Sequence, residues 1–184
     1  MNKPSFKNPF DFINSYNRNI DCLFEYWLSN FKKGKILNYI PFQTVIAHYI
    51  YKHDNNGVSF RCGAGNKLKI VDLDGNVFWC DEYIGGDNGM IGNIQFETES
   101  SIQLSHKDIF KDCENCKHTD LCLGRCRKCL LEYNHEHIRN YCRMTIHLID
   151  IIESKIHLIK EIIDKQKLTM EEFYPIPKNT EEIP

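Results

Sequence analysis

The feature that most constrains this chain is its cysteine content: nine cysteines among 184 residues, five of them between positions 113 and 129. The segment around them, residues 104–129, holds too few apolar side chains to form a hydrophobic core by itself. Clustered cysteines in a cytosolic protein bind metal more often than they form disulfides, because the cytosol keeps thiols reduced. We therefore predict that bound metal holds this segment in shape.

Composition and charge place the chain among ordinary globular proteins of one or two domains. Hydrophobic residues make up 42% and charged residues 26%, and the formal net charge is −2. These values exclude a disordered or rod-like chain and give no strongly basic surface of the kind that binds nucleic acid. No apolar run reaches the ~20 residues of a membrane span, and no apolar segment of a secretory signal follows the N-terminus. We expect a cytoplasmic protein that binds neither nucleic acid nor membrane.

The first third of the chain has the pattern of two helices. A helix is predicted over residues 9–33, with a capping asparagine before it, a proline at its first position and a glycine after it. Apolar residues recur along this helix at three- and four-residue steps, namely Phe10, Ile13, Tyr16, Ile20, Leu23, Phe24, Trp27, Leu28 and Phe31. Cys22 is predicted to be a small buried member of this stripe. A second helix is predicted from Pro41 to His53.

The middle of the chain is predicted to form a small β-hairpin. Two short strands are expected at residues 67–71 and 77–80. Asp74 and Gly75 between them favour a type I′ turn, which requires positive φ at both central residues. Residues 81–93 are rich in Gly, Asp and Asn, so a loop is predicted there.

The last third returns to a helical pattern. Its isoleucine stripe predicts a long helix at residues 146–173, which either packs within the chain or docks onto a partner. Residues 174–184 are predicted to form a disordered, proline-containing acidic tail. The expected fold class is therefore α+β, with a helical region at residues 1–58, a small hairpin-based domain at residues 59–145 and the C-terminal helix.

Seven of the cysteines form a regular series. With x for any residue, it reads Cys62-x12-Gly75-x4-Cys80, then Cys113-x2-Cys116-x5-Cys122-x3-Cys126, and finally Cys142. Thiolates are soft ligands that favour zinc or iron–sulfur clusters, and each such site takes four ligands. Seven cysteines therefore fill one site and leave three for a second, which is open at one position or completed by another residue. Spacing alone does not separate zinc from iron–sulfur.

This arrangement resembles the SPASM domain of radical SAM enzymes, whose cysteines follow the pattern C-x9–15-G-x4-C, then C-x2-C-x5-C-x3-C, then a final C. The flanking sequence is similar as well, with DLDGNVFWC at residues 72–80, IGNI at residues 91–94 and LCLGRC at residues 121–126. The resemblance covers about residues 20–160. The helices before Cys62 look like the linker that joins the radical SAM barrel to this domain.

The resemblance implies two auxiliary [4Fe–4S] clusters. By analogy, the ligands of the first cluster are Cys113, Cys116, Cys122 and Cys142. The second cluster would be held by Cys62, Cys80 and Cys126. Cations near such a cluster would lower the cost of its reduction, whereas the alternative is a solvated basic loop. The basic residues of this region are Lys111, Lys117, Arg125, Arg127 and Lys128.

The second site departs from the pattern of some relatives, which complete it with a further cysteine. The matching position here is Leu68. The site therefore either has an open iron or takes its fourth ligand from Cys129, Cys22 or Asp81. Cys129 is otherwise a spare thiol, and the sequence leaves both roles open.

The resemblance does not extend to the part of the family that cleaves SAM. Cys122-x3-Cys126-x2-Cys129 has the spacing of the motif that binds the SAM-cleaving cluster. That motif precedes a partial barrel of about a hundred or more residues, whereas 55 residues follow Cys129, so we attribute the match to coincidence. We expect this chain to bind no SAM and not to be catalytic alone.

The function implied by the resemblance is that of an accessory domain in radical SAM-dependent peptide or protein modification. Such a domain helps to bind the peptide or protein substrate beside the barrel, which belongs to the same enzyme or to a partner subunit. Its clusters carry an electron to or from the substrate radical. The alternatives are a standalone electron carrier and a structural zinc module without a catalytic role. A disulfide framework is a weaker alternative in a cytosolic chain.

Overall fold

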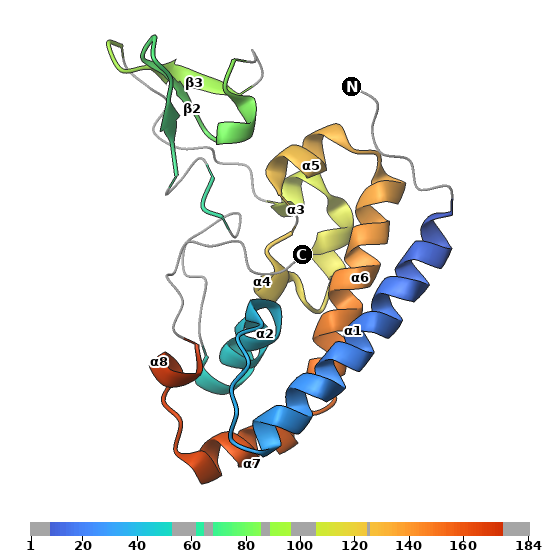
Figure 1. Ribbon diagram of the computed structural model, residues 1–184. Helices are drawn as coiled ribbons and strands as arrows, with labels where there is room; N and C mark the ends of the chain where they lie inside the picture. The colour runs from blue at the N-terminus through green and yellow to red at the C-terminus, as the bar shows by residue number, and fades with distance from the viewer. Residues whose placement is uncertain are drawn as a thin grey trace. The chain divides into compact units, whose positions relative to one another are not determined.

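The computed structural model describes residues 8–52, 62–64, 68–85, 89–96, 106–124 and 126–174 (Figure 1). The chain divides into two compact units. The first, which we call the helical unit, contains Met1–Asp54 and Glu136–Pro177, and the second, the cysteine unit, contains Asn55–His135. Helices together with one three-stranded antiparallel sheet confirm the predicted α+β class.

The helical unit contains the two helices that the N-terminal sequence predicts. Helix α1 spans Pro9–Lys32 and α2 spans Ile40–Tyr51. The side chain of Asn8 caps α1 by accepting hydrogen bonds from two backbone amides of its first turn. Gly34 follows the helix with a φ of +79°, a conformation that glycine adopts at little cost, and the chain turns there. The predicted end of the second helix at His53 lies outside the described residues.

Large aromatic side chains form the centre of the helical unit. Trp27 and Phe31 on α1 stack with their ring centres 4.9 Å apart, and Phe42 on α2 meets Trp27 edge-on at 6.0 Å. Phe173 contacts Phe31 at 5.6 Å. All four side chains are at most 1% exposed, and Trp27 Nε1 donates a hydrogen bond to the carbonyl of Leu37 at 2.9 Å. Burial of this much apolar surface stabilises the unit.

The C-terminal helical segment is divided into successive helices. Helix α6 spans His135–Glu153, α7 spans Ile156–Gln166 and α8 spans Met170–Phe173. Lys167 ends α7 in the left-handed conformation, at a φ of 55°, and Thr169 then starts α8 with a capping box. The isoleucines at positions 149, 152, 159 and 163 are at most 3% exposed, so the isoleucine stripe packs within this chain.

Two side chains of the helical unit correct the sequence predictions. Cys22 is exposed rather than buried. It lies two residues from both Ile20 and Phe24, which are buried, and two residues turn an α-helix by about 200°, away from the core. Tyr174, predicted to belong to the disordered tail, is 4% exposed, and its hydroxyl lies 3.2 Å from Thr44 Oγ1. The rest of the predicted tail lies outside the described residues.

The cysteine unit contains a small antiparallel sheet in the order β1-β2-β3. Strands β1 (Ile70–Val71) and β2 (Asn76–Phe78) form the predicted hairpin and are shorter than expected. Strand β3 (Met90–Asn93) pairs with β2 and corrects the prediction of a loop over residues 81–93. Backbone pairing with a distant segment stabilises this strand, although its own sequence has no alternating apolar pattern.

The hairpin turn is not the predicted type I′ turn. Gly75 has a φ of +79°, but Asp74 is not among the described non-glycine residues with positive φ. The side chain of Asp72 accepts hydrogen bonds from the amides of Asp74 at 3.0 Å and Asn76 at 2.8 Å. These bonds hold a three-residue loop in which only the last position is left-handed.

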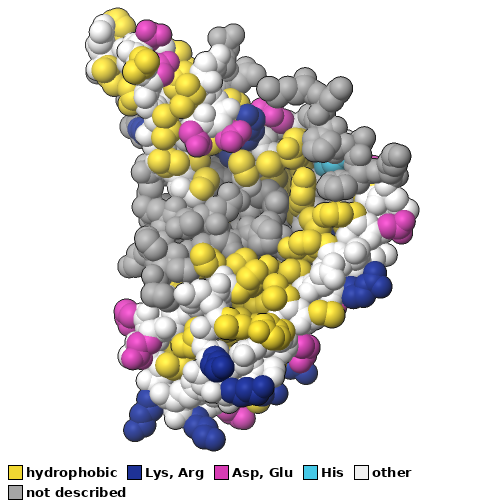
Figure 2. Space-filling model, viewed as in Figure 1, with side chains coloured by type: hydrophobic (Ala, Val, Ile, Leu, Met, Phe, Trp, Pro, Cys, Tyr) yellow, Lys and Arg dark blue, Asp and Glu magenta, His cyan; other side chains and the backbone are white. Residues whose placement is uncertain are grey.

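Short helical turns contain or directly adjoin most of the cysteines of the cysteine unit. They are η1 (Asp81–Tyr83), α3 (His106–Ile109), η2 (Lys111–Asn115), α4 (Thr119–Cys122) and α5 (Arg127–Glu132). Figure 2 shows apolar side chains exposed over the sheet, and the exposed ones there include Val71, Leu73, Ile94 and Phe96. None of the described helices combines the length and the apolar character needed to cross a membrane.

Candidate metal centre

Cys62 and Cys80 meet in one small core of the cysteine unit. Cys80 follows β2, precedes η1 and is 8% exposed. Its buried neighbours in this core are Ala64, Phe78, Trp79 and Tyr83. Cys62 is partly buried and packs against the same core. Packing of the sheet therefore brings together two of the three cysteines predicted for the second site.

Cys126, the third cysteine predicted for this site, lies near Cys80. The pKa of the Cys80 thiol is raised to about 11, mainly by burial, and the charges of Asp81 and Cys126 raise it further. Burial, the Glu132 carboxylate and the charge of Cys126 together raise the pKa of Tyr83. The Cys80 thiol is therefore neutral at pH 7, and a metal ligated by it would have to displace its proton.

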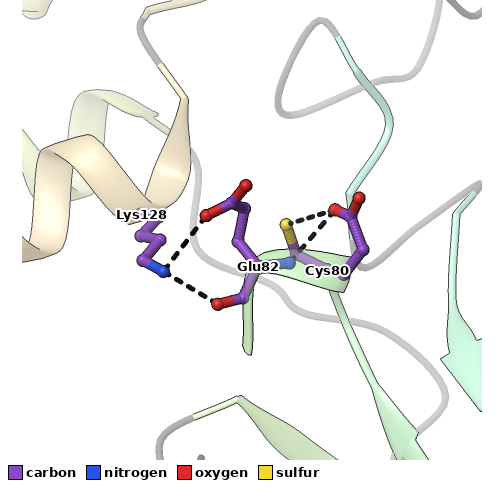
Figure 3. A network of polar contacts seen from close by, with 4 residues as sticks. Cys80, Glu82 and Lys128 are labelled. Atoms are coloured by element: carbon purple, nitrogen blue, oxygen red, sulfur yellow. Dashed lines mark hydrogen bonds and ion pairs between the residues drawn. The ribbon is translucent and has the colours of Figure 1, made fainter. Parts of the chain in front are cut away.

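The carboxylate of Asp81 lies beside the Cys80 sulfur. Figure 3 shows the polar contacts around Cys80 and Glu82. Cys80 Sγ donates to Asp81 Oδ1 at 3.4 Å, and the same oxygen accepts the amide of Glu82 at 3.1 Å. Among the residues predicted as alternatives for the fourth position, Asp81 is in contact with Cys80. Cys129 lies in α5 and is half-buried, and Cys22 is exposed on α1 in the helical unit.

Two cations at the start of α5 lie over the aromatic rings that flank Cys80. The guanidinium carbon of Arg127 is 4.7 Å from the centre of the Trp79 ring, and Lys128 Nζ is 5.0 Å from the centre of the Tyr83 ring. Cation–π contacts of this length are attractive. Of the five predicted basic residues, these two therefore lie beside the second site, and Arg125 lies outside the described residues.

Cys113, Cys116 and Cys122 lie on neighbouring turns, η2 and α4. Cys113 is buried within η2, and Cys116 follows that turn, with its amide donating to the Cys113 carbonyl at 3.4 Å. Cys122 is the last residue of α4, and its amide donates to the carbonyl of His118 at 2.8 Å. Because η2 and α4 contact each other, local folding brings the three cysteines into one region.

Cys142, the predicted fourth ligand of the first site, lies on α6 in the helical unit and is half-buried. Its pairing with the cysteines of η2 and α4 stays a prediction, and so does a ligand role for Cys129. Leu68, at the position where some relatives carry a further cysteine, is 37% exposed. All nine cysteines belong to the described residues, and no disulfide joins any of them.

The thiols of the cysteine unit are spaced more widely than a single zinc ion requires. A zinc ion at about 2.3 Å from each sulfur draws its ligands to within about 4 Å of one another. In the described part of this unit, no three cysteine sulfurs lie within 4.8 Å of one another. An iron–sulfur cluster binds each thiolate through a different iron atom and holds its ligands farther apart. Within the described part of the cysteine unit, the thiols are therefore not preassembled as a three-sulfur zinc site.

The chain is similar to two enzymes of Clostridium perfringens, each named cysteine-type anaerobic sulfatase-maturating enzyme. With that of strain ATCC 13124 it is 31% identical over 127 residues, which cover 62% of this chain and 32% of the enzyme. With that of strain 13 it is 30% identical over 127 residues, with the same coverage. The chain thus spans about a third of the length of these relatives. No protein-family profile and no solved structure matches it.

Sequence reasoning identifies the cysteines but not the side chains packed around them. The contacts of Trp79 and Tyr83 with α5 are tertiary, and no local pattern predicts them. The one available signal for these side chains is their position next to a cysteine. The aromatic Trp79 directly precedes Cys80, and the basic Arg127 directly follows Cys126.

Proposed function

We propose that this chain is a SPASM-type domain that carries up to two auxiliary [4Fe–4S] clusters and assists radical SAM-dependent modification of a protein. The observation that supports this most is the gathering of cysteines from separate segments: Cys62 and Cys80 share one core, and Cys126 lies near Cys80. A cluster shared between segments requires such an arrangement. The seven-cysteine series agrees with it.

The relatives support a protein as the substrate. Their names describe enzymes that mature sulfatases, which are themselves proteins. We propose that this chain likewise acts on a peptide or protein substrate, together with a radical SAM barrel domain or subunit. The cytoplasm is the proposed location, because it keeps the thiols reduced. The reaction of the whole enzyme is proposed for that assembly and not for this chain alone.

The proposed ligands follow the cysteine series. For the first cluster they are Cys113, Cys116, Cys122 and Cys142. For the second they are Cys62, Cys80 and Cys126, with Asp81 or Cys129 as candidates for the fourth position. When bound, a cluster supplies a path for one electron to or from the substrate radical. The chain itself excludes water from Cys80, which is 8% exposed, and places positive charge beside it.

Anaerobic purification and iron–sulfur reconstitution test this proposal, followed by metal and sulfide analysis and by EPR of the dithionite-reduced protein. Two clusters give about eight irons and eight sulfides per chain, with two overlapping EPR signals. About four of each would support one cluster and overturn the second. Stoichiometric zinc without sulfide would overturn both and leave a structural metal module.

Matched cysteine variants assign the iron to each site. Cys113→Ser should remove the first cluster and Cys80→Ser the second, so each variant is expected to keep about half of the iron. Cys22→Ser replaces a thiol that is exposed on α1, and this control should keep all of it. Equal iron content in the control and in both ligand variants would contradict the assignment.

A further inference from the structure

Four side chains join two distant segments of the cysteine unit. Arg127 lies over the Trp79 ring at 4.7 Å and Lys128 over the Tyr83 ring at 5.0 Å, each measured to the ring centre. The two rings are themselves 4.5 Å apart and tilted by 43°. We call Trp79, Tyr83, Arg127 and Lys128 the cation–π clamp.

The clamp residues are sequence neighbours of two proposed ligands. Trp79 directly precedes Cys80. Arg127 directly follows Cys126. Stacking of the guanidinium on the indole ring therefore restrains the distance between the two cysteine backbones, whatever metal is bound.

A polar contact between α5 and η1 reinforces the clamp (Figure 3). Lys128 Nζ donates to the backbone carbonyl of Glu82 at 2.8 Å and pairs with its carboxylate at 3.3 Å. Glu82 lies in η1, the turn that begins directly after Cys80. Because one of these contacts is to a carbonyl, Lys128 restrains the main chain next to Cys80 as well as a side chain.

Arg127 places a permanent positive charge in a buried position. It is 8% exposed, and burial lowers the pKa of its guanidinium, although an arginine stays protonated at neutral pH. A buried cation is costly by itself but favourable beside anionic ligands, whose charge is poorly screened there. Lys128 shares its charge with the Glu82 carboxylate at 3.3 Å.

We propose that the cation–π clamp positions Cys126 against Cys80 and that the charge of Arg127 raises the reduction potential of the cluster held there. This rests on the proposed function, because it takes the second site to be a cluster site. Positive charge favours the reduced and more negative state of a cluster. Arg127 and Lys128 are thus positioning residues, and Arg127 also sets the potential of the site.

Cadmium binding tests the positioning role without iron. In a background that carries Cys113→Ser and Cys116→Ser, Cd²⁺ binding is followed by the ultraviolet absorption of the cadmium–thiolate bond. Arg127→Leu should weaken Cd²⁺ binding about tenfold and Lys128→Met about threefold, because each removes one cation–π contact. Arg127→Lys should restore most of the affinity.

The matched control for this titration is Lys111→Met. Lys111 is an exposed lysine of the same unit, and its ion pair with Glu114 at 2.8 Å lies within η2, beside the first site. This variant should bind Cd²⁺ as the background does. A loss equal to that of Arg127→Leu would overturn the specific role of the clamp and indicate a general effect of net charge.

An EPR-monitored redox titration of the reconstituted chain tests the charge. Arg127→Leu should lower the midpoint potential of the second cluster. For a one-electron couple, a shift of about 59 mV corresponds to a tenfold change in the ratio of reduced to oxidised cluster at a given potential. Arg127→Lys keeps the charge and should keep the potential. A purely structural role for Arg127 would not produce this pattern.

The outcomes separate this proposal from the function on which it rests. If the wild-type chain takes up no iron and sulfide, the proposed function fails, and the Cd²⁺ titration still decides the positioning role. Unchanged Cd²⁺ affinity and unchanged potential in Arg127→Leu would overturn the clamp alone. If circular dichroism shows that Arg127→Leu is unfolded, Lys128→Met decides instead, and wild-type Cd²⁺ affinity in that variant overturns the proposal.

Discussion

The centre of the helical unit and the core around Cys80 both contain large aromatic side chains, but only the second also contains thiols. In the helical unit, Trp27, Phe42 and Phe173 are at most 1% exposed, and Trp27 contacts both phenylalanines. In the cysteine unit, the core around Cys80 is a cluster of five buried residues that includes an alanine and Cys80 itself. Phe96, a large apolar residue of the same unit, is 73% exposed.

This difference indicates two sources of stability in one chain. Apolar burial on the scale of the helical unit is sufficient to hold helices together. A core of five buried residues, with Cys80 among them and Cys62 packed against it, buries little apolar surface. Domains with such small cores rely on bound metal or other cross-links. We therefore infer that the helical unit keeps its structure without metal, whereas the cysteine unit depends on what its thiols bind.

Metal removal should produce the largest effect on local stability. It is also the most direct test of whether the two units differ in what stabilises them. We expect iron removal from the reconstituted chain to speed amide hydrogen exchange at least tenfold in η1, η2 and α5, because metal binding energy is folding energy in such sites. Exchange in α1 and α2 should change little. Mass spectrometry of the exchanged peptides measures both units in one sample, and equal acceleration in the two units would refute the distinction.

The second prediction tests whether the aromatic core stabilises the helical unit. Trp27→Ala should lower the free energy of unfolding by about 3–5 kcal/mol, since it empties the space between Phe31 and Phe42. Urea unfolding followed by circular dichroism measures the loss. Tyr26→Ala is the control on the same helix: Tyr26 is 61% exposed, and its loss should cost less than about 0.5 kcal/mol. Similar losses in both variants would show that the aromatic core is not what holds the unit.

The same contrast decides how much of the fold the sequence predicts. Helices α1 and α2 depend on local signals, such as the Asn8 cap and the apolar spacing, and both were predicted within two residues of their starts and ends in the described part. Strand β3 was missed because its stability comes from pairing with β2, which no local pattern records. The hairpin turn was misjudged because the Asp72 side chain, and not the turn residues alone, selects the backbone conformation.

The candidate site was predictable to a similar extent. The positions of the cysteines in the sequence identify them as candidate ligands. The sequence also places Asp81 next to Cys80 without any knowledge of the fold. The clamp contacts were not predictable, because Trp79 and Arg127 meet only after the sheet and α5 have formed. Cys22 was misplaced for a different reason: the helical period puts it opposite the buried residues on either side, and its hydrophobic character suggested otherwise.

The smallest expected effect concerns a polar contact of the helical unit. Tyr51 at the end of α2 donates a hydrogen bond from its hydroxyl to the Leu168 carbonyl at 2.9 Å. Burial, followed by the charges of Asp164, Glu172 and Glu171, raises the pKa of Tyr51 from 10 to about 12. The folded state therefore favours the neutral phenol. Its contribution to stability is fully present below pH 10 and is lost as the pH rises from 10 to about 12.

Tyr51→Phe removes both the hydrogen bond and the titration. At neutral pH the variant should lose about 1 kcal/mol of unfolding free energy, well below the loss in Trp27→Ala, because Tyr51 is half-exposed. Above pH 10 the wild-type chain should approach the variant, so the difference between their urea midpoints should shrink as the pH rises. A difference that stays constant across this range would mean that the phenol titrates with the same pKa in the folded and unfolded states, and it would contradict the raised pKa of Tyr51.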